Sequence, residues 1–103
     1  MKIKGISDIE KIYDTSFNGL LFKASTKKII EKLGKPDFRD EPTEKVTREW
    51  VLELEDGTPF SIYDYAEYRK YGDSTVIEWH VGTTDKDGTN KVKEALIEIG
   101  LYK

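Results

Sequence analysis

The feature that most constrains the fold of this chain is a pair of alternating runs that meet at Asp56-Gly57. In KVTREWVLELEDGTPFSIYDY, residues 45–65, apolar and polar side chains alternate on both sides of this dipeptide. Alternation with a period of two is typical of a strand with one buried face. Asp-Gly between two such runs is typical of a hairpin turn, because both residues tolerate positive φ. The segment therefore predicts an antiparallel β-hairpin.

A third alternating run, TVIEWHV at residues 75–81, predicts a strand that completes a meander. The alternation assigns one face of the sheet to the core, including both tryptophans: Trp50, Leu52, Leu54, Phe60, Ile62, Ile77, Trp79 and Val81. The opposite face, called the outer face below, then carries Glu49, Val51, Glu53, Ser61, Tyr63, Val76, Glu78 and His80. Because the outer set mixes apolar and charged side chains, it suits either a solvated surface or a contact with a ligand or subunit.

Capping signals predict a short first helix and a second one. Ser7 and Glu10 match a capping box, and the apolar residues that follow at positions 9, 12 and 13 are expected to pack one or two turns onto the core. Ser25 or Thr26 is expected to cap the second helix, which stops at Gly34. Its inner stripe consists of Ile29, Ile30 and Leu33.

A last helix is expected from about Thr89 to Ile99, with Val92, Ala95, Leu96 and Ile99 in one apolar stripe. Asn18-Gly19 predicts a turn before a short extended piece at residues 20–23, and the polar segment 36–43 predicts a loop. The expected fold is a single α+β domain over residues 1–103. It consists of a small antiparallel sheet of three to four strands, arranged as a meander, with two to three helices packed on one face.

Composition excludes several classes of protein. The 17 basic and 20 acidic residues are interspersed, which argues against a broad basic surface for DNA. The absence of cysteine excludes disulfides and thiolate metal sites. No apolar run approaches the length of a membrane span, and the N-terminus lacks a signal-peptide pattern. We therefore expect a soluble, intracellular protein that binds neither DNA nor a membrane.

Catalytic signals are weak. The chain has one histidine, His80, so the usual zinc sites cannot be built, and no metal or cofactor is expected. Neither a nucleophile elbow, a Walker loop nor a dinucleotide-binding glycine motif is present. Helix caps such as Ser25-Thr26, or the loop at Thr83-Thr84, offer only weak phosphate-binding signals. The sequence favours a protein that is not an enzyme, with a nucleotide-degrading enzyme as the less favoured alternative.

The loop YAEYRKYGD, residues 65–73, adds three tyrosines and two basic residues after the hairpin. Tyrosine rings stack on nucleobases, and a guanidinium pairs with phosphate, so Tyr65, Tyr68 and Arg69 suit a nucleotide ligand. The alternative is that the tyrosines anchor the loop to the rim of the core while Arg69 and Lys70 are solvated.

The order of motifs resembles a widespread family of small phage proteins. The pattern is a helix that ends in G-x-P, then K-V-x-x-E-W, a D-G-T hairpin, I-Y-D-W or I-Y-D-Y, and E-W-H-I-G. The chain matches it at Gly34, Pro36, Lys45, Val46, Glu49, Trp50, residues 56–58, 62–64 and 78–82. Tyr65 replaces the usual tryptophan, and Val81 replaces isoleucine. The match covers residues 16–82. In this region the chain resembles the phage anti-CBASS sponges, proteins that bind cyclic nucleotides.

This resemblance implies a protein of the host cytoplasm that binds cyclic oligonucleotide immune signals without cleaving them. It further implies a homo-oligomer, a dimer or a tetramer, with the ligand held between subunits. Residues whose chemistry suits such a ligand are Tyr63, Tyr65, Tyr68, Arg48, Arg69 and His80, with Asn18 and Gly19 as a place for close backbone approach. The alternative is a protein-binding inhibitor of a host enzyme that acts through the outer face.

Overall fold

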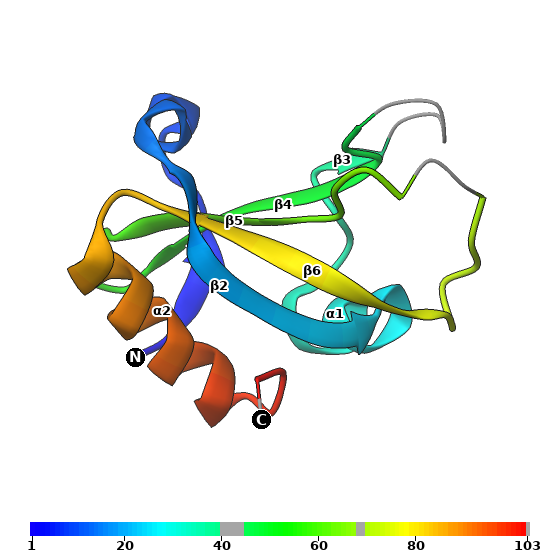
Figure 1. Ribbon diagram of the computed structural model, residues 1–103. Coiled ribbons are helices and arrows are strands. Elements are labelled where there is room, and N and C mark those ends of the chain that lie inside the picture. Colours follow the sequence, from blue (N-terminus) through cyan, green and yellow to red (C-terminus); the bar gives the residue numbers. More distant parts are fainter. Residues whose placement is uncertain (40–44, 68–69, 103) are drawn as a thin grey trace.

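The computed structural model describes residues 1–39, 45–67 and 70–102. Within them the chain forms one antiparallel sheet in the order β1-β4-β5-β6-β2, with β3 paired to β4 (Figure 1). The strands are β1 (Ile3–Gly5), β2 (Ser16–Ser25), β3 (Phe38–Arg39), β4 (Arg48–Leu54), β5 (Pro59–Tyr63) and β6 (Val76–Thr83). The helices are η1 (Ile9–Asp14), a 3₁₀ helix, with α1 (Thr26–Leu33) and α2 (Lys86–Glu98). The expected α+β class with an antiparallel sheet is confirmed.

The hairpin and its buried face are confirmed in register. Trp50 pairs with Ile62 and Leu52 with Phe60 across β4 and β5, and Ile62 pairs with Val81 across β5 and β6. All eight residues assigned to the core face are at most 4% exposed. The two tryptophans meet edge to face, with ring centroids 5.4 Å apart. Their assignment to the core is therefore confirmed.

The sheet is larger than the three to four strands expected, because β1, β3 and β2 add to its edges. Asn18-Gly19 was expected to be a turn, and here that expectation is wrong. Phe17 pairs with Gly82 and Leu21 with His80, so four residue steps on β2 span two steps on β6. The dipeptide therefore forms a β-bulge inside one continuous strand, with Gly19 at a φ of 92°.

The helices α1 and α2 cover the core face, as Figure 1 shows beneath the sheet. Ile29 of α1 and Val92 and Leu96 of α2 are fully buried in the same cluster as the tryptophans. Ser25 caps α1, and Gly34 ends it with a φ of 87°. The helix α2 begins three residues earlier than predicted, since Asp85 accepts a hydrogen bond from the Gly88 N–H at 2.7 Å.

The first helix differs from the prediction in its cap and in the face that it covers. Asp8, not Ser7, is the N-cap residue of η1, and its carboxylate accepts from the Glu10 N–H. Ile12 lies over the outer face beside Ser61 and Tyr63, and Tyr13 is 75% exposed. The six-residue η1 packs on the outer face because α1 and α2 already cover the core face. No helix among the described residues is long and apolar enough to cross a membrane.

Candidate functional site

Three aromatic rings gather on the outer face around the imidazole of His80 on β6. Tyr63 of β5 stacks on the imidazole with ring centroids 5.7 Å apart and an interplanar angle of 26°. Phe17 of β2 and Tyr65, in the loop after β5, meet it at 4.9 Å and 5.4 Å in tilted arrangements. These four residues, called the His80 cluster, line an open hollow of about 310 Å³. The sequence had singled out three of them.

Strand pairing explains why these rings meet. Tyr63 and His80 are direct partners in the β5–β6 register, so their side chains stand side by side on the outer face. The β-bulge brings Phe17 opposite Gly82, one pleat along β6 from His80. A Cβ at Gly82 would lie 2.7 Å from the Ser61 hydroxyl and 3.6 Å from the Tyr63 ring. The glycine of the E-W-H-x-G motif therefore leaves space beside Tyr63.

Sequence reasoning missed Phe17. Its side chain is 44% exposed although it is a large apolar ring, and Tyr65 is 47% exposed. The signal that points to Phe17 is its position next to Asn18-Gly19, read as a β-bulge on an edge strand rather than as a turn. A cluster of exposed aromatic side chains on one sheet face is unusual for a solvated surface and is typical of a contact site.

The His80 cluster contains two polar groups of interest, the hydroxyl of Tyr63 and the Nδ1 atom of His80. Burial, then the nearby Glu49 carboxylate, raises the pKa of Tyr63 above its ordinary value, so its hydroxyl stays protonated at neutral pH. The Nδ1 atom of His80 is shielded from solvent and has no hydrogen-bond partner among the described residues. Buried polar atoms are nearly always paired, so an unpaired one calls for an explanation.

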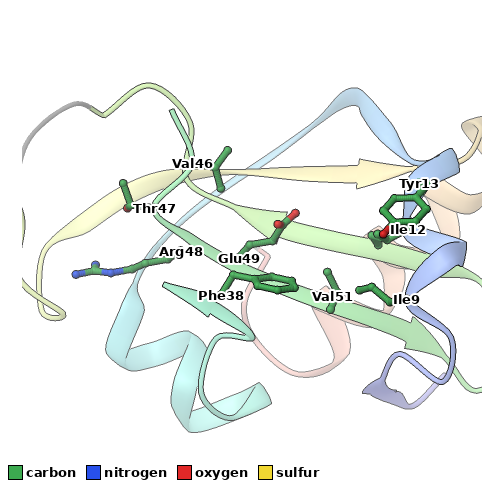
Figure 2. A pocket seen from close by; sticks show the side chains of 9 residues that line it. All are labelled: Ile9, Ile12, Tyr13, Phe38, Val46, Thr47, Arg48, Glu49 and Val51. Atoms are coloured by element: carbon green, nitrogen blue, oxygen red, sulfur yellow. The ribbon is translucent and has the colours of Figure 1, made fainter. Parts of the chain in front are cut away.

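Two further hollows lie along the outer face toward η1. One, of about 340 Å³, is lined mainly by apolar side chains of η1, β3 and β4 and is called the η1 hollow (Figure 2). Its exposed apolar residues are Ile9, Tyr13 and Phe38. The other, of about 250 Å³, shares Glu49 with the η1 hollow and Tyr63 with the His80 cluster. The outer face thus carries a continuous series of hollows.

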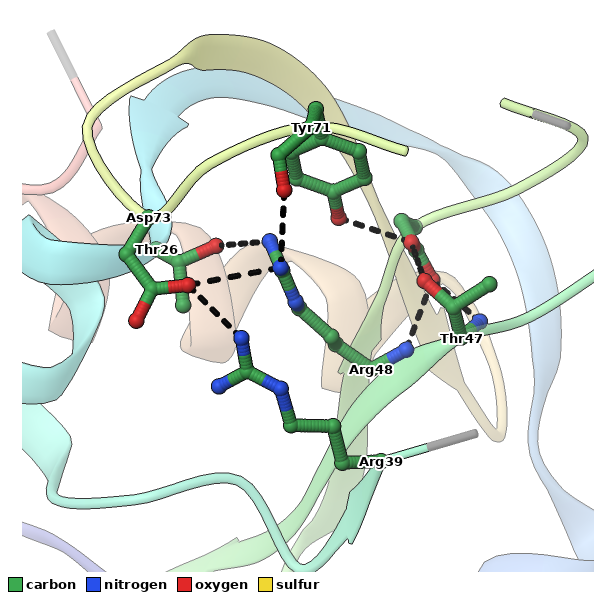
Figure 3. Close-up of polar contacts among 7 residues, drawn as sticks. Thr26, Arg39, Thr47, Arg48, Tyr71 and Asp73 are labelled. Atoms are coloured by element: carbon green, nitrogen blue, oxygen red, sulfur yellow. Dashed lines mark hydrogen bonds and ion pairs between the residues drawn. The ribbon is translucent and has the colours of Figure 1, made fainter. Parts of the chain in front are cut away.

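The Arg48 side chain points to the core side of the sheet, away from the other candidates, although the residue also lines the η1 hollow. Its guanidinium donates to the Thr26 hydroxyl at 2.8 Å and to the Tyr71 carbonyl at 3.1 Å, and lies 3.3 Å from the Asp73 carboxylate (Figure 3). Its Cζ atom is 4.1 Å from the centroid of the Tyr71 ring. Arg39 pairs with the same Asp73 oxygen at 2.8 Å. Because Arg48 is buried and fully engaged, it joins β4 to the start of α1 and does not reach the His80 cluster.

Asp64, the aspartate of the I-Y-D motif, is fully buried at the centre of that network. Its carboxylate accepts from the backbone N–H groups of Thr47 and Arg48 at 2.7 and 2.9 Å, and also from the Thr47 hydroxyl. The Tyr71 hydroxyl donates to it at 2.7 Å. Burial, followed by this hydrogen bond, raises the pKa of Tyr71. The motif aspartate therefore fastens β4 to the segment after β5, a role that sequence reasoning did not assign.

Asn18 and Gly19 shape the site without lining it. The Asn18 amide donates to the Thr83 carbonyl at 3.0 Å and to the Thr83 hydroxyl at 2.9 Å, which fixes the β-bulge beside Phe17. Gly19 provides the positive φ, and a Cβ there would meet nothing within 4 Å. The remaining candidates, Tyr68 and Arg69, lie outside the described residues. The structure therefore brings together Tyr63, Tyr65 and His80, adds Phe17, and separates Arg48.

Among the described residues, no three His, Asp or Glu side chains are grouped so that they could hold a metal ion. Comparison of the chain with protein-family models, curated proteins and solved structures found no match. The resemblance to phage sponges therefore stays a prediction from the motifs. What can be argued about function comes from the geometry of the outer face.

Proposed function

We propose that this protein binds and sequesters cyclic oligonucleotide immune signals without cleaving them, as a phage counter-defence protein of the host cytoplasm. The observation that carries the proposal is the His80 cluster, an open hollow of about 310 Å³ lined by four rings. Every nucleobase presents a flat π face, and stacking on an aromatic side chain contributes about 1–3 kcal/mol per base. The cluster is suited to receive one base.

The size of the hollow bears on the oligomeric state. Its volume lies at the lower end of the roughly 300–1,000 Å³ that is usual for small-molecule sites, so one cluster holds part of a cyclic dinucleotide. A second copy of the chain would provide a second cluster for the second base. The proposal therefore includes a homo-oligomer, a dimer or a tetramer, that encloses the ligand between subunits.

Binding without cleavage fits the chemistry of the cluster. Hydrolysis of a phosphodiester calls for a positioned base or nucleophile together with groups that stabilise the developing negative charge. The described residues that line the hollow supply one imidazole, two phenol rings and one phenyl ring, without a carboxylate or a cationic side chain among them. The Tyr63 hydroxyl is a neutral hydrogen-bond donor at neutral pH, as tyrosine ordinarily is, and burial raises its pKa further. These features favour recognition of the base.

A thermal-shift screen against cyclic di- and trinucleotides tests the proposal. We expect at least one of them to raise the melting temperature and to be recovered intact by chromatography after heat release. Tyr63→Ala should weaken its binding by about 1–3 kcal/mol. Tyr13→Ala, a change to another outer-face tyrosine outside the cluster, should leave the affinity unchanged. Recovery of cleaved ligand, or no shift with any cyclic nucleotide, would contradict the proposal.

The η1 hollow favours a second candidate function, a protein-binding inhibitor of a host enzyme. Exposed apolar side chains from η1 and β3 line this hollow, and such groups are frequent in protein contacts. For this function we expect a stable complex in a pulldown from host lysate. Tyr13→Ala should then weaken the complex, and neither Tyr63→Ala nor added nucleotide should affect it.

A further inference from the structure

We infer that the Nδ1 atom of His80 accepts a hydrogen bond from an N–H group of a bound nucleobase. His80 would then favour bases that present an N–H donor over bases that lack one, beyond the stacking that any aromatic ring provides. The inference rests on the proposed function for the class of ligand. It assigns a specific atom to the reading of the base edge.

The Nδ1 atom of His80 is buried and unpaired among the described residues, although Tyr63, Tyr65 and Phe17 all contact the imidazole ring. A buried polar group without a partner costs free energy, and such groups are retained where another molecule supplies the partner or where function requires them. A buried N–H without an acceptor is rarer than an acceptor without a donor. The unpaired Nδ1 is therefore assigned as an acceptor.

The imidazole of His80 is held in one orientation by its neighbours. His80 lies on β6 between β5 and β2, where Tyr63 and Leu21 are its partners in the ladders. Strands on both sides fix its backbone, and the stacked Tyr63 ring limits rotation of the side chain. A hydrogen-bonding atom held in one direction discriminates between ligands, because a wrong ligand leaves it unpaired.

Access of a base to Nδ1 requires a local rearrangement. Because Nδ1 is covered in the free protein, a base can reach it only if one of the surrounding rings moves. Phe17 and Tyr63 belong to strands, whereas Tyr65 belongs to a loop and is 47% exposed. The N–H of the next residue, Ala66, donates to the Lys45 carbonyl at 2.7 Å, so the backbone there is held and the Tyr65 side chain is the part that would rotate. Tyr65 is thus the ring that moves aside and then packs against the base.

The chemistry of the bases defines the ligands that the site should accept. Adenine, cytosine and guanine offer an exocyclic amino group, and guanine and uracil offer a ring N–H. Methylation removes these donors and preserves the flat ring. Unmodified nucleosides should therefore bind, and N6,N6-dimethyladenosine and N3-methyluridine should bind at least 10-fold more weakly than their parents.

Nitrogen-15 NMR of the imidazole tests the inference directly, because the chain has a single histidine and its signals need no assignment by mutation. The labelled protein is titrated with the four common ribonucleosides and, separately, with cyclic dinucleotides. A shift of the Nδ1 resonance on saturation with an unmodified nucleoside, absent with its methylated analogue, is expected. Binding that leaves Nδ1 unshifted, or the absence of any response to nucleosides and cyclic dinucleotides, would overturn the inference.

The two probes separate the inference from the proposed function. If nucleosides shift Nδ1 and no cyclic dinucleotide binds, the base site stands and sequestration of cyclic signals fails. If a cyclic dinucleotide binds tightly with Nδ1 unchanged, sequestration stands and the assignment of His80 fails.

Two substitutions at His80 provide a second readout. His80→Phe keeps a flat ring and removes the unpaired nitrogen, so the free protein should melt at a higher temperature while its affinity for the bound nucleoside falls at least 10-fold. His80→Asn retains an oxygen acceptor near the position of Nδ1 and should restore part of that affinity. If His80→Phe raises the melting temperature and binds as tightly as the wild type, Nδ1 has no part in recognition.

Discussion

The two sides of the sheet differ in whether their buried polar groups have hydrogen-bond partners. On the core side, the Asp64 carboxylate accepts four hydrogen bonds, and Arg48 has three polar partners. On the outer side, Nδ1 of His80 is shielded from solvent without a partner among the described residues. The core-side network is complete and holds the fold together. The His80 cluster has a hydrogen-bonding atom without a partner among the described residues, as expected of a ligand-binding surface.

This difference separates two roles within one set of sequence motifs. Trp50 and Trp79 donate from their indole N–H groups to the carbonyls of Gly34 and Ala24, both at 2.9 Å. They link the strands to the residues on either side of α1, whereas Asp64 fastens β4 to the segment after β5. His80 and Gly82 come from the same motif as Trp79 and shape the outer hollow instead. The motif residues therefore divide into those that hold the fold together and those that shape the outer hollow.

The largest effect is expected from Asp64→Ala. Removal of the carboxylate takes away the buried acceptor of the Thr47 and Arg48 backbone N–H groups and one partner of the Tyr71 hydroxyl. We expect a loss of about 3–5 kcal/mol in the free energy of unfolding, measured by urea denaturation. Asp73→Asn, at a carboxylate that is 44% exposed, is the control and should cost far less. A loss below about 1 kcal/mol for Asp64→Ala would show that the network contributes little to stability.

Arg48→Met should have an intermediate effect. The substitution keeps an unbranched side chain of similar length and removes the contacts with Thr26, Tyr71 and Asp73. We expect a loss of about 1–3 kcal/mol by urea denaturation, because the polar partners lose a charged donor. The nucleotide affinity should stay unchanged, since Arg48 is on the core side. A specific loss of affinity would contradict the separation of the two faces.

Acid should weaken the attachment of η1 to the outer face. Hydrogen bonds from Ser7, followed by the interactions with Lys11, lower the pKa of Glu53 from 4.5 to about 2. This depressed pKa contributes stability that is fully present above the unfolded value of 4.5 and is lost as pH falls toward 2. Thermal unfolding between pH 6 and pH 2, set by this pKa range, should show the decline.

Glu53→Gln provides the comparison for that experiment. The variant should be less stable than the wild type at neutral pH and should decline less on acidification. Asp56 also has a pKa lowered to about 2, through Thr58, so Asp56→Asn measures its separate share of the acid transition. A Glu53→Gln profile parallel to that of the wild type would mean that Glu53 is not a source of the acid sensitivity.

The smallest effect on stability is expected from Tyr65→Ala. Its ring is 47% exposed and belongs to a loop, so the free energy of unfolding should change by less than about 0.5 kcal/mol. Nucleotide affinity should nevertheless fall by about 1–3 kcal/mol in calorimetric titrations, because a stacking ring is lost. Equal losses in stability and affinity would indicate that Tyr65 supports the fold.

The sequence predicted the parts of the fold that depend on local pattern. Alternation around Asp56-Gly57 placed Trp50, Phe60 and Trp79 correctly, because a period of two fixes which side of a sheet each residue faces. Capping residues placed α1 correctly for the same local reason. The prediction of a turn at Asn18-Gly19 was wrong, because a glycine with positive φ suits a turn and a β-bulge equally well.

For the candidate site, the sequence supplied residue types and faces but not partners. It placed Tyr63 and His80 on the outer face, and strand register then made them neighbours. For Phe17 the only signal was its position next to Asn18-Gly19, and nothing indicated that Arg48 is bound by Thr26 and Asp73. These contacts join segments far apart in the chain. The hairpin, the helix ends and the core face follow from interactions between near neighbours. The unpaired nitrogen of His80 and the hollow beside it exist only once β2, β5 and β6 are side by side, since burial and hydrogen-bond pairing are properties of the packed molecule.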